Sequence, residues 1–116
     1  MGDISKHFNR SEFACNCGCG FDTVDIETIK VLEDVREHFN QPITVTSGCR
    51  CEDYNYKVGG SKNSQHAKGR AADIQVKNTS PADVYDFVDL LYPDQFGFGK
   101  YNDFTHIDTR SVKARW

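Results

Sequence analysis

Two stretches of the chain repeat apolar residues at helical intervals. Between Thr23 and Phe39 apolar side chains recur mostly every three to four positions, and charged residues fill much of the other face, as in an amphipathic helix. A second helix is predicted after Ser80, a good N-cap, with Pro81 at its first position and Pro93 beyond its end. The apolar positions are Val24, Ile29, Leu32, Val35 and Phe39, then Val84, Phe87, Val88 and Leu91.

Four shorter segments have the pattern of strands: Ile43–Thr46, Ala71–Val76, Phe96–Tyr101 and Phe104–Asp108. The second follows a polar loop that contains Gly59-Gly60-Ser61, and Asn102-Asp103 predicts a hairpin turn between the last two. Near the N-terminus, Phe8 and Phe13 are expected to anchor their segment to the body of the protein. Helices and strands in this order predict an α+β fold, a small antiparallel sheet with flanking helices.

The size and charge of the chain limit the classes of protein it can belong to. Its 116 residues predict one domain over residues 1–116, and we expect a monomer. With 14 basic and 17 acidic residues the net charge is -3, which gives no electrostatic reason to expect nucleic acid as a partner. No apolar run approaches the roughly 20 residues of a membrane span. Residues 1–6 lead into no apolar stretch, so no signal peptide is predicted.

Five cysteines form two clusters, Cys15, Cys17 and Cys19, then Cys49 and Cys51. An odd number cannot all pair within one chain, and without a secretory signal a disulfide framework is a poor prediction. The Cys-x-Cys spacing also differs from the Cys-x2-Cys of ordinary zinc ribbons. A zinc module held by cysteines and a disulfide both stay open.

Candidate metal chemistry lies in a histidine and a carboxylate seven positions apart. His66 and Asp73 join a glycine-containing loop to a predicted strand, and His106 lies near the end of the last predicted strand. Two imidazoles and one carboxylate, with a fourth position left to water, are the ligand set of a catalytic zinc. Spacing alone would equally fit a solvated surface histidine and an aspartate that caps a strand end.

A longer pattern surrounds these residues. Residues 64–73 read Ser-x-His-x-x-Gly-x-Ala-x-Asp, which resembles the signature of the zinc D-Ala-D-Ala carboxypeptidase family, a family that includes phage endolysins. Cys49 replaces the usual tyrosine of the family's SGYR element. The segments that carry further similarity, in the family's order along nearly the whole chain, are Ser5–Phe8, Ser11–Phe13, Thr46–Arg50 and Phe104–Thr109.

The resemblance implies a role for each matching position. His66, Asp73 and His106 would be the zinc ligands. Arg50 would hold the substrate carboxylate or the developing oxyanion, a role that suits its fixed guanidinium fork. A surface salt bridge is the alternative for Arg50.

The sequence offers two candidates for the general base. Relatives often carry a glutamate three residues before the last histidine ligand, and Asp103 occupies that position before His106. Asp108 is the rival, because residues two apart on a strand share a face. We favour Asp103, although its side chain is one methylene shorter than glutamate. Ser64 and Gln65 are expected to contact substrate or to shape the loop.

The family implies the small α+β fold that these peptidases share with the hedgehog signalling domain. The implied reaction is zinc-dependent hydrolysis of a peptidoglycan stem-peptide amide next to a D-amino acid, by a carboxypeptidase or an endolysin endopeptidase. The alternative is a non-enzymatic, zinc-stabilised virion or cell-wall-binding module on the same fold. We expect a phage-encoded or virion-associated protein that degrades the host cell wall, or otherwise a cytoplasmic one. Cysteines near both clusters in related sequences imply that the two clusters meet, as a second metal site or a disulfide.

Overall fold

A five-stranded sheet forms the centre of the protein in a computed structural model that describes residues 3–60 and 64–116. Ser61, part of the predicted polar loop, lies outside the described residues, as do residues 1–2. The strands are β1 (Ile43–Ser47), β2 (Ala71–Val76), β3 (Gly97–Lys100), β4 (Thr105–Asp108) and β5 (Ala114–Arg115). The helical elements are η1 (Arg10–Phe13), α1 (Ile26–Phe39), α2 (Glu52–Lys57) and α3 (Pro81–Leu91).

The strands are arranged in the order β1-β2-β4-β3-β5. The first four are antiparallel neighbours, as predicted, and β3 and β4 form the predicted hairpin. The two-residue strand β5 pairs parallel with β3, so the complete sheet is mixed. The α+β fold class is therefore confirmed, with an additional edge strand too short to be recognised in the sequence.

Both predicted helices are present. The first begins at Ile26, after Asp25 in extended conformation, and ends at Phe39, followed by Asn40, whose φ of 51° places it in the left-handed region. The second begins as predicted, because the Ser80 hydroxyl accepts a hydrogen bond from the backbone N–H of Asp83. The short helices η1 and α2 were not predicted.

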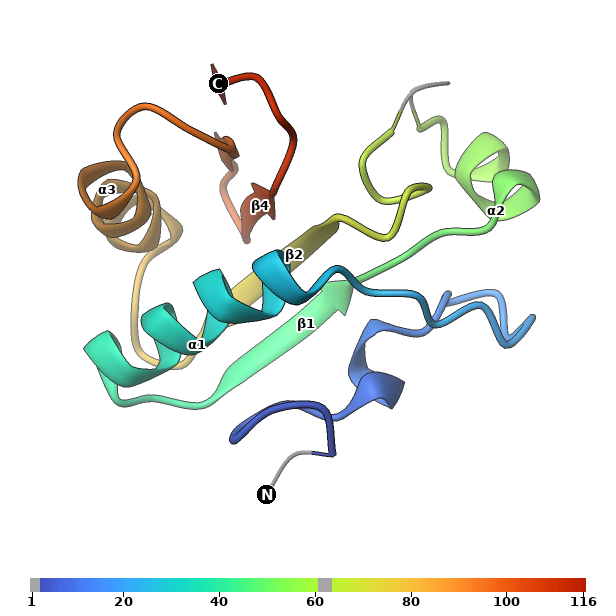
Figure 1. Ribbon diagram of the computed structural model, residues 1–116, viewed down its shortest axis with the longest axis horizontal. Coiled ribbons are helices and arrows are strands. Elements are labelled where there is room, and N and C mark those ends of the chain that lie inside the picture. The colour runs from blue at the N-terminus through green and yellow to red at the C-terminus, as the bar shows by residue number, and fades with distance from the viewer. Residues whose placement is uncertain (1–2, 61–63) are drawn as a thin grey trace.

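The two faces of the sheet differ in chemistry. Helices α1 and α3 pack against one face, with α1 lying across β1 and β2 in Figure 1. The strands contribute apolar side chains to this core, namely Ala72, Ile74, Val76, Phe98 and Ile107. Alternate positions point the other way, so Asp73 and His106 lie together on the opposite face. That face carries the candidate site.

The N-terminal segment is held against this body by apolar and polar contacts. Phe8 and Phe13 are buried in the core, which confirms their predicted anchoring role. Glu33 of α1 accepts hydrogen bonds from the Ser5 hydroxyl and from the backbone N–H and ring of His7. Burial favours a higher pKa for Glu33, but these bonds outweigh it and lower the pKa below its ordinary value.

No helix in the described part of the chain is long and apolar enough to cross a bilayer. The extent of the domain, residues 1–116, stays a prediction, as does the monomeric state.

We expect Glu33→Gln to lower the free energy of unfolding at pH 7 by about 1–3 kcal/mol, because hydrogen bonds to a charged acceptor are lost. A lowered folded-state pKa stabilises the protein above the unfolded pKa, and this contribution disappears as the pH falls through the folded pKa. The difference between variant and wild type, measured by urea denaturation, should therefore shrink in acid. The control is Glu37→Gln, at an exposed position of the same helix. A pH-independent difference would contradict the assignment.

Candidate active site

Three side chains predicted as metal ligands come together on the open face of the sheet. Asp73 of β2 and His106 of β4 are directly paired across the ladder, and His66 comes from the turn that precedes β2. All three are buried, with exposed fractions of 6%, 8% and 4% respectively. The sheet thus supplies two donors and the loop supplies the third.

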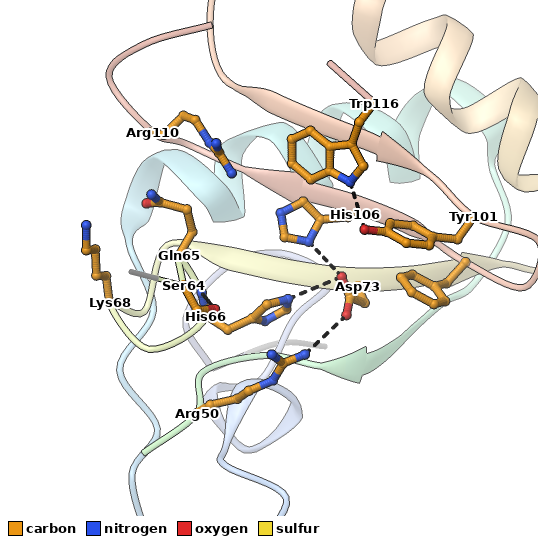
Figure 2. Close-up of a pocket in the computed structure, with 11 residues that line it drawn as sticks. Arg50, Ser64, Gln65, His66, Lys68, Asp73, Tyr101, His106, Arg110 and Trp116 are labelled. Atoms are coloured by element: carbon orange, nitrogen blue, oxygen red, sulfur yellow. Dashed lines mark hydrogen bonds and ion pairs between the residues drawn. The ribbon is translucent and has the colours of Figure 1, made fainter. Parts of the chain in front are cut away.

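The nitrogen atoms of both histidines face one carboxylate oxygen, as Figure 2 shows. Asp73 Oδ1 lies 2.9 Å from His106 Nδ1 and 3.3 Å from His66 Nε2. The donor atoms of the three residues all lie within 4.8 Å of one another. Neighbouring ligands of a tetrahedral zinc with bonds of about 2.0–2.1 Å are separated by about 3.4 Å. The spacing and the mixed N and O donors fit zinc.

The tautomer of His66 is fixed by the backbone. Its Nδ1 lies 2.6 Å from the carbonyl oxygen of Gly48, which can only accept, so Nδ1 carries the proton. This leaves Nε2, which points toward Asp73, as the ring nitrogen that can bind a metal. A hydrogen bond of this kind orients a histidine ligand and makes it a better donor to a metal.

His106 is oriented by a carboxylate instead. Its Nε2 donates to Asp108 Oδ2 at 2.7 Å, which leaves Nδ1 for a metal. Arg110 in turn donates to both oxygens of Asp108, from Nε at 2.8 Å and from a terminal nitrogen at 2.7 Å. Asp108 is completely buried, so its place is at the back of the site.

The ionisable groups of the cluster stabilise one another's charged forms. Burial would raise the pKa of Asp73, but hydrogen bonds from His106 and His66 lower it to about 2. Burial alone would lower the pKa of His106, yet its bonds to Asp108 and Asp73 raise it. Burial likewise opposes the lowered pKa of Asp108, which results from the bonds of His106 and Arg110. Both aspartates are therefore charged at neutral pH.

A pocket of about 610 Å³ opens over the three donors. Arg50, Lys68 and Arg110 border it with positive charge. Aromatic side chains form another wall, where the rings of Tyr101 and Phe104 stack at 4.5 Å. Next to them, the indole N–H of Trp116 donates to the Tyr101 hydroxyl at 2.7 Å. The pocket combines cationic groups with apolar surface.

Arg50 reaches the cluster from the loop after β1. One terminal nitrogen lies 3.8 Å from Asp73 Oδ2, and the guanidinium is also held by the Ser47 hydroxyl and the Asn55 side chain. The backbone N–H of Arg50 donates to the carbonyl of His66 at 3.0 Å, which ties the two loops together. The structure therefore brings Arg50 to the metal ligands.

Ser64 and Gln65 also line the pocket. The Ser64 hydroxyl accepts a hydrogen bond from the backbone N–H of His66, which is a loop-shaping contact. Gln65 Oε1 is buried, and within residues 3–60 and 64–116 no group donates to it. Such an acceptor is costly unless a donor from outside the protein reaches it.

Asp103, the other candidate for the general base, lies farther along the sheet than Asp108, in the turn between β3 and β4. It is exposed in the β3–β4 turn and is not among the residues that line the pocket. Its backbone carbonyl accepts a hydrogen bond from Gln75 Nε2 at 2.9 Å, and Gln75 shares the open face of β2 with Asp73. The turn is thus fastened at the end of the site, with the carboxylate of Asp103 outside the cluster.

The sequence reasoning missed several residues of the pocket. Arg110 and Trp116 follow the last recognised motif, and no spacing signal linked them to the histidines. The sequence of β3 did contain a signal for the site, because Gly97 and Gly99 are two residues apart and both face the open side of the sheet. A Cβ at Gly97 would lie 2.4 Å from Asp108 Oδ1, and one at Gly99 would lie 2.4 Å from Trp116 Nε1. Both glycines make room for the site.

We expect Gly97→Ala to weaken zinc affinity by roughly 10–100-fold, because its methyl group displaces the carboxylate that orients His106. Competition with a chromophoric chelator measures this affinity. Lys100→Ala, at an exposed position of the same strand, is the control. A folded Gly97→Ala protein with wild-type zinc affinity would show that Asp108 does not need its observed position.

Comparison with known proteins agrees with this geometry. A zinc D-Ala-D-Ala carboxypeptidase of Streptomyces albus G is 35% identical in an alignment of 74 positions that covers 59% of this chain and 28% of that protein. The chain thus matches little more than a quarter of that relative's length. Its name specifies zinc, which is the metal that the sequence predicted and that the donor set fits. A family model described as Peptidase M15 matches residues 6–108, which include every predicted ligand. The predicted resemblance is confirmed, and the chain belongs to the peptidase M15 family.

Proposed function

We propose that the protein is a zinc-dependent peptidase that hydrolyses amide bonds next to a D-amino acid in the stem peptides of peptidoglycan. The observation that carries this proposal is the convergence of His66, Asp73 and His106 in a pocket bordered by Arg50, in a chain of the peptidase M15 family. The name of the Streptomyces relative supports the choice of substrate.

The charge of the pocket suits a substrate with a free carboxylate. Arg50, Lys68 and Arg110 lie around its border, whereas the protein as a whole carries a net charge of -3. A stem peptide ends in a carboxylate, which a guanidinium binds through two parallel hydrogen bonds. The positive charge therefore selects the end of the peptide.

Two further features suit a short peptide with small apolar side chains. The aromatic wall of Tyr101, Phe104 and Trp116 offers a surface to the methyl group of an alanine. The buried Oε1 of Gln65 accepts a substrate N–H and would otherwise lack a donor among the described residues. Gln65 thereby orients the peptide backbone over the metal ligands.

The residues divide the catalytic work. Zinc held by His66, Asp73 and His106 supplies Lewis acidity, which polarises a carbonyl and makes water more acidic. Arg50 stabilises negative charge on the carbonyl oxygen as the amide is attacked. The predicted base is Asp103, which takes the proton from water and returns it to the leaving amine.

The proposal includes two activities, a carboxypeptidase and an endopeptidase, and one biological setting. Removal of a terminal D-alanine and cleavage within a cross-bridge use the same chemistry, so the products decide between carboxypeptidase and endopeptidase. The proposed setting, a phage-encoded or virion-associated enzyme that acts on a host cell wall, rests on the resemblance to phage endolysins.

Digestion of purified peptidoglycan tests the proposal. The zinc-loaded protein should release free D-alanine or cleaved cross-bridge peptides, identified by mass spectrometry, and His66→Ala should release neither. Binding to peptidoglycan without any product would overturn the proposal in favour of a non-enzymatic wall-binding module.

We expect Arg50→Ala to retain zinc and to lose about 10²–10³-fold in kcat/KM, because the guanidinium acts on the substrate and the transition state. Zinc content and hydrolysis rates of a synthetic stem peptide provide the two measurements. Lys57→Ala removes an exposed cation of α2 and serves as the control. Activity of Arg50→Ala within about twofold of wild type would assign Arg50 to a structural role.

The two aspartates are expected to respond differently to replacement by asparagine. Asp103→Asn should keep zinc and abolish the acidic limb of the pH–rate profile, since the general base is lost. Asp108→Asn should instead weaken zinc affinity by roughly 10–100-fold, with activity partly restored by added zinc. Zinc titration together with pH–rate profiles of both variants separates these outcomes. An exchange of the two behaviours would make Asp108 the base.

A further inference from the structure

Four of the five cysteines meet in a cluster outside the candidate active-site pocket. Cys15, Cys17 and Cys19 lie in the loop between η1 and α1, and Cys51 lies at the start of α2. Their four sulfur atoms all lie within 4.8 Å of one another. The fifth, Cys49, is buried, and its thiol donates to carbonyl oxygens of η1 and of the same loop.

The separations of the sulfur atoms match the edges of a coordination tetrahedron. Cys15 and Cys17 are 3.4 Å apart at Sγ, Cys17 and Cys51 are 3.6 Å apart, and Cys15 and Cys51 are 3.8 Å apart. Four ligands at a zinc–sulfur distance of about 2.3 Å are separated by about 3.8 Å. These three separations are similar to one another, and all of them are longer than a disulfide bond. With Cys19 inside the same 4.8 Å limit, the four sulfur atoms are grouped as ligands around one ion would be.

The backbone around the sulfurs is shaped for this arrangement. Gly18, between Cys17 and Cys19, and Gly20, directly after Cys19, adopt φ values of 81° and 91°, a left-handed conformation that curls the loop around the cysteines. The backbone N–H of Cys51 donates to Cys15 Sγ, and that of Tyr54 donates to Cys51 Sγ, each at 3.4 Å. Such N–H groups stabilise the negative charge of metal-bound thiolates.

We propose that Cys15, Cys17, Cys19 and Cys51 bind a second, structural zinc ion. Four thiolates form a closed site with no position for water, in contrast to the open site of the two histidines and the aspartate. This zinc fastens the loop before α1, which has no helix or strand of its own, to the chain immediately after Arg50. The proposal is independent of any peptidase activity.

Metal analysis of protein purified without oxygen tests this assignment. We expect about two zinc equivalents per wild-type chain, and about one each in Cys17→Ser and in His66→Ala. Cys49→Ser is the matched control, because it makes the same replacement outside the cluster and should keep both equivalents. One equivalent in wild type that is unchanged in Cys17→Ser would overturn the proposal.

Two measurements on the wild-type protein need no folded variant. A thiol-reactive mercurial should release one zinc equivalent from the cysteines, detected with a chromophoric indicator. Cobalt-substituted protein should show a thiolate-to-cobalt charge-transfer band in the near ultraviolet, which the histidine–aspartate site cannot produce. Absence of that band, or disulfides among these four cysteines in the intact mass, would also overturn the proposal.

Discussion

The register between β2 and β4 is the constraint on which the candidate site depends. It sets Asp73 directly opposite His106 on the face that the helices leave open. A shift of either strand by one residue would turn its own side chain, Asp73 or His106, into the apolar core. The apolar core therefore stabilises the fold and also positions the site, because the packing of α1 and α3 on one face of the sheet fixes the candidate ligands on the other. Only His66 depends on a loop, and the carbonyl of Gly48 orients it.

The site buries charged side chains, and removing them from water costs free energy. The Asp73 carboxylate is nearly removed from solvent, and two imidazoles and the Arg50 guanidinium surround it. A buried carboxylate without such partners would cost several kcal/mol, or would take up a proton and cease to be a metal ligand. The same logic explains Asp108, whose bonds to His106 and Arg110 keep it charged. The side chains of the site are thus arranged for a divalent cation.

The sequence predicts those features of the structure that a local pattern of residues specifies. The two long helices, the four antiparallel strands and the candidate metal ligands each have a periodicity or a motif of their own. Helix α2 and strand β5 have neither, because each is short and depends on tertiary contacts for its existence. The aromatic wall was missed for a related reason, since Trp116 reaches the pocket only through the parallel pairing of β5 with β3. The turn position of Asp103 was recognised, whereas its distance from the ligands is a property of the whole fold.

The alternation along the central strands divides the protein by the parity of residue number. On β2 the even-numbered side chains, such as Ile74, belong to the core and the odd-numbered ones to the open face, while β4 has the opposite assignment. The positions that stabilise the fold and the positions that carry the chemistry therefore alternate along each strand, and their side chains point to opposite faces of the sheet. Substitutions on one face can therefore leave the side chains of the other face unchanged. One layer of sheet thus separates the residues that determine the stability of the fold from the residues that determine its chemistry.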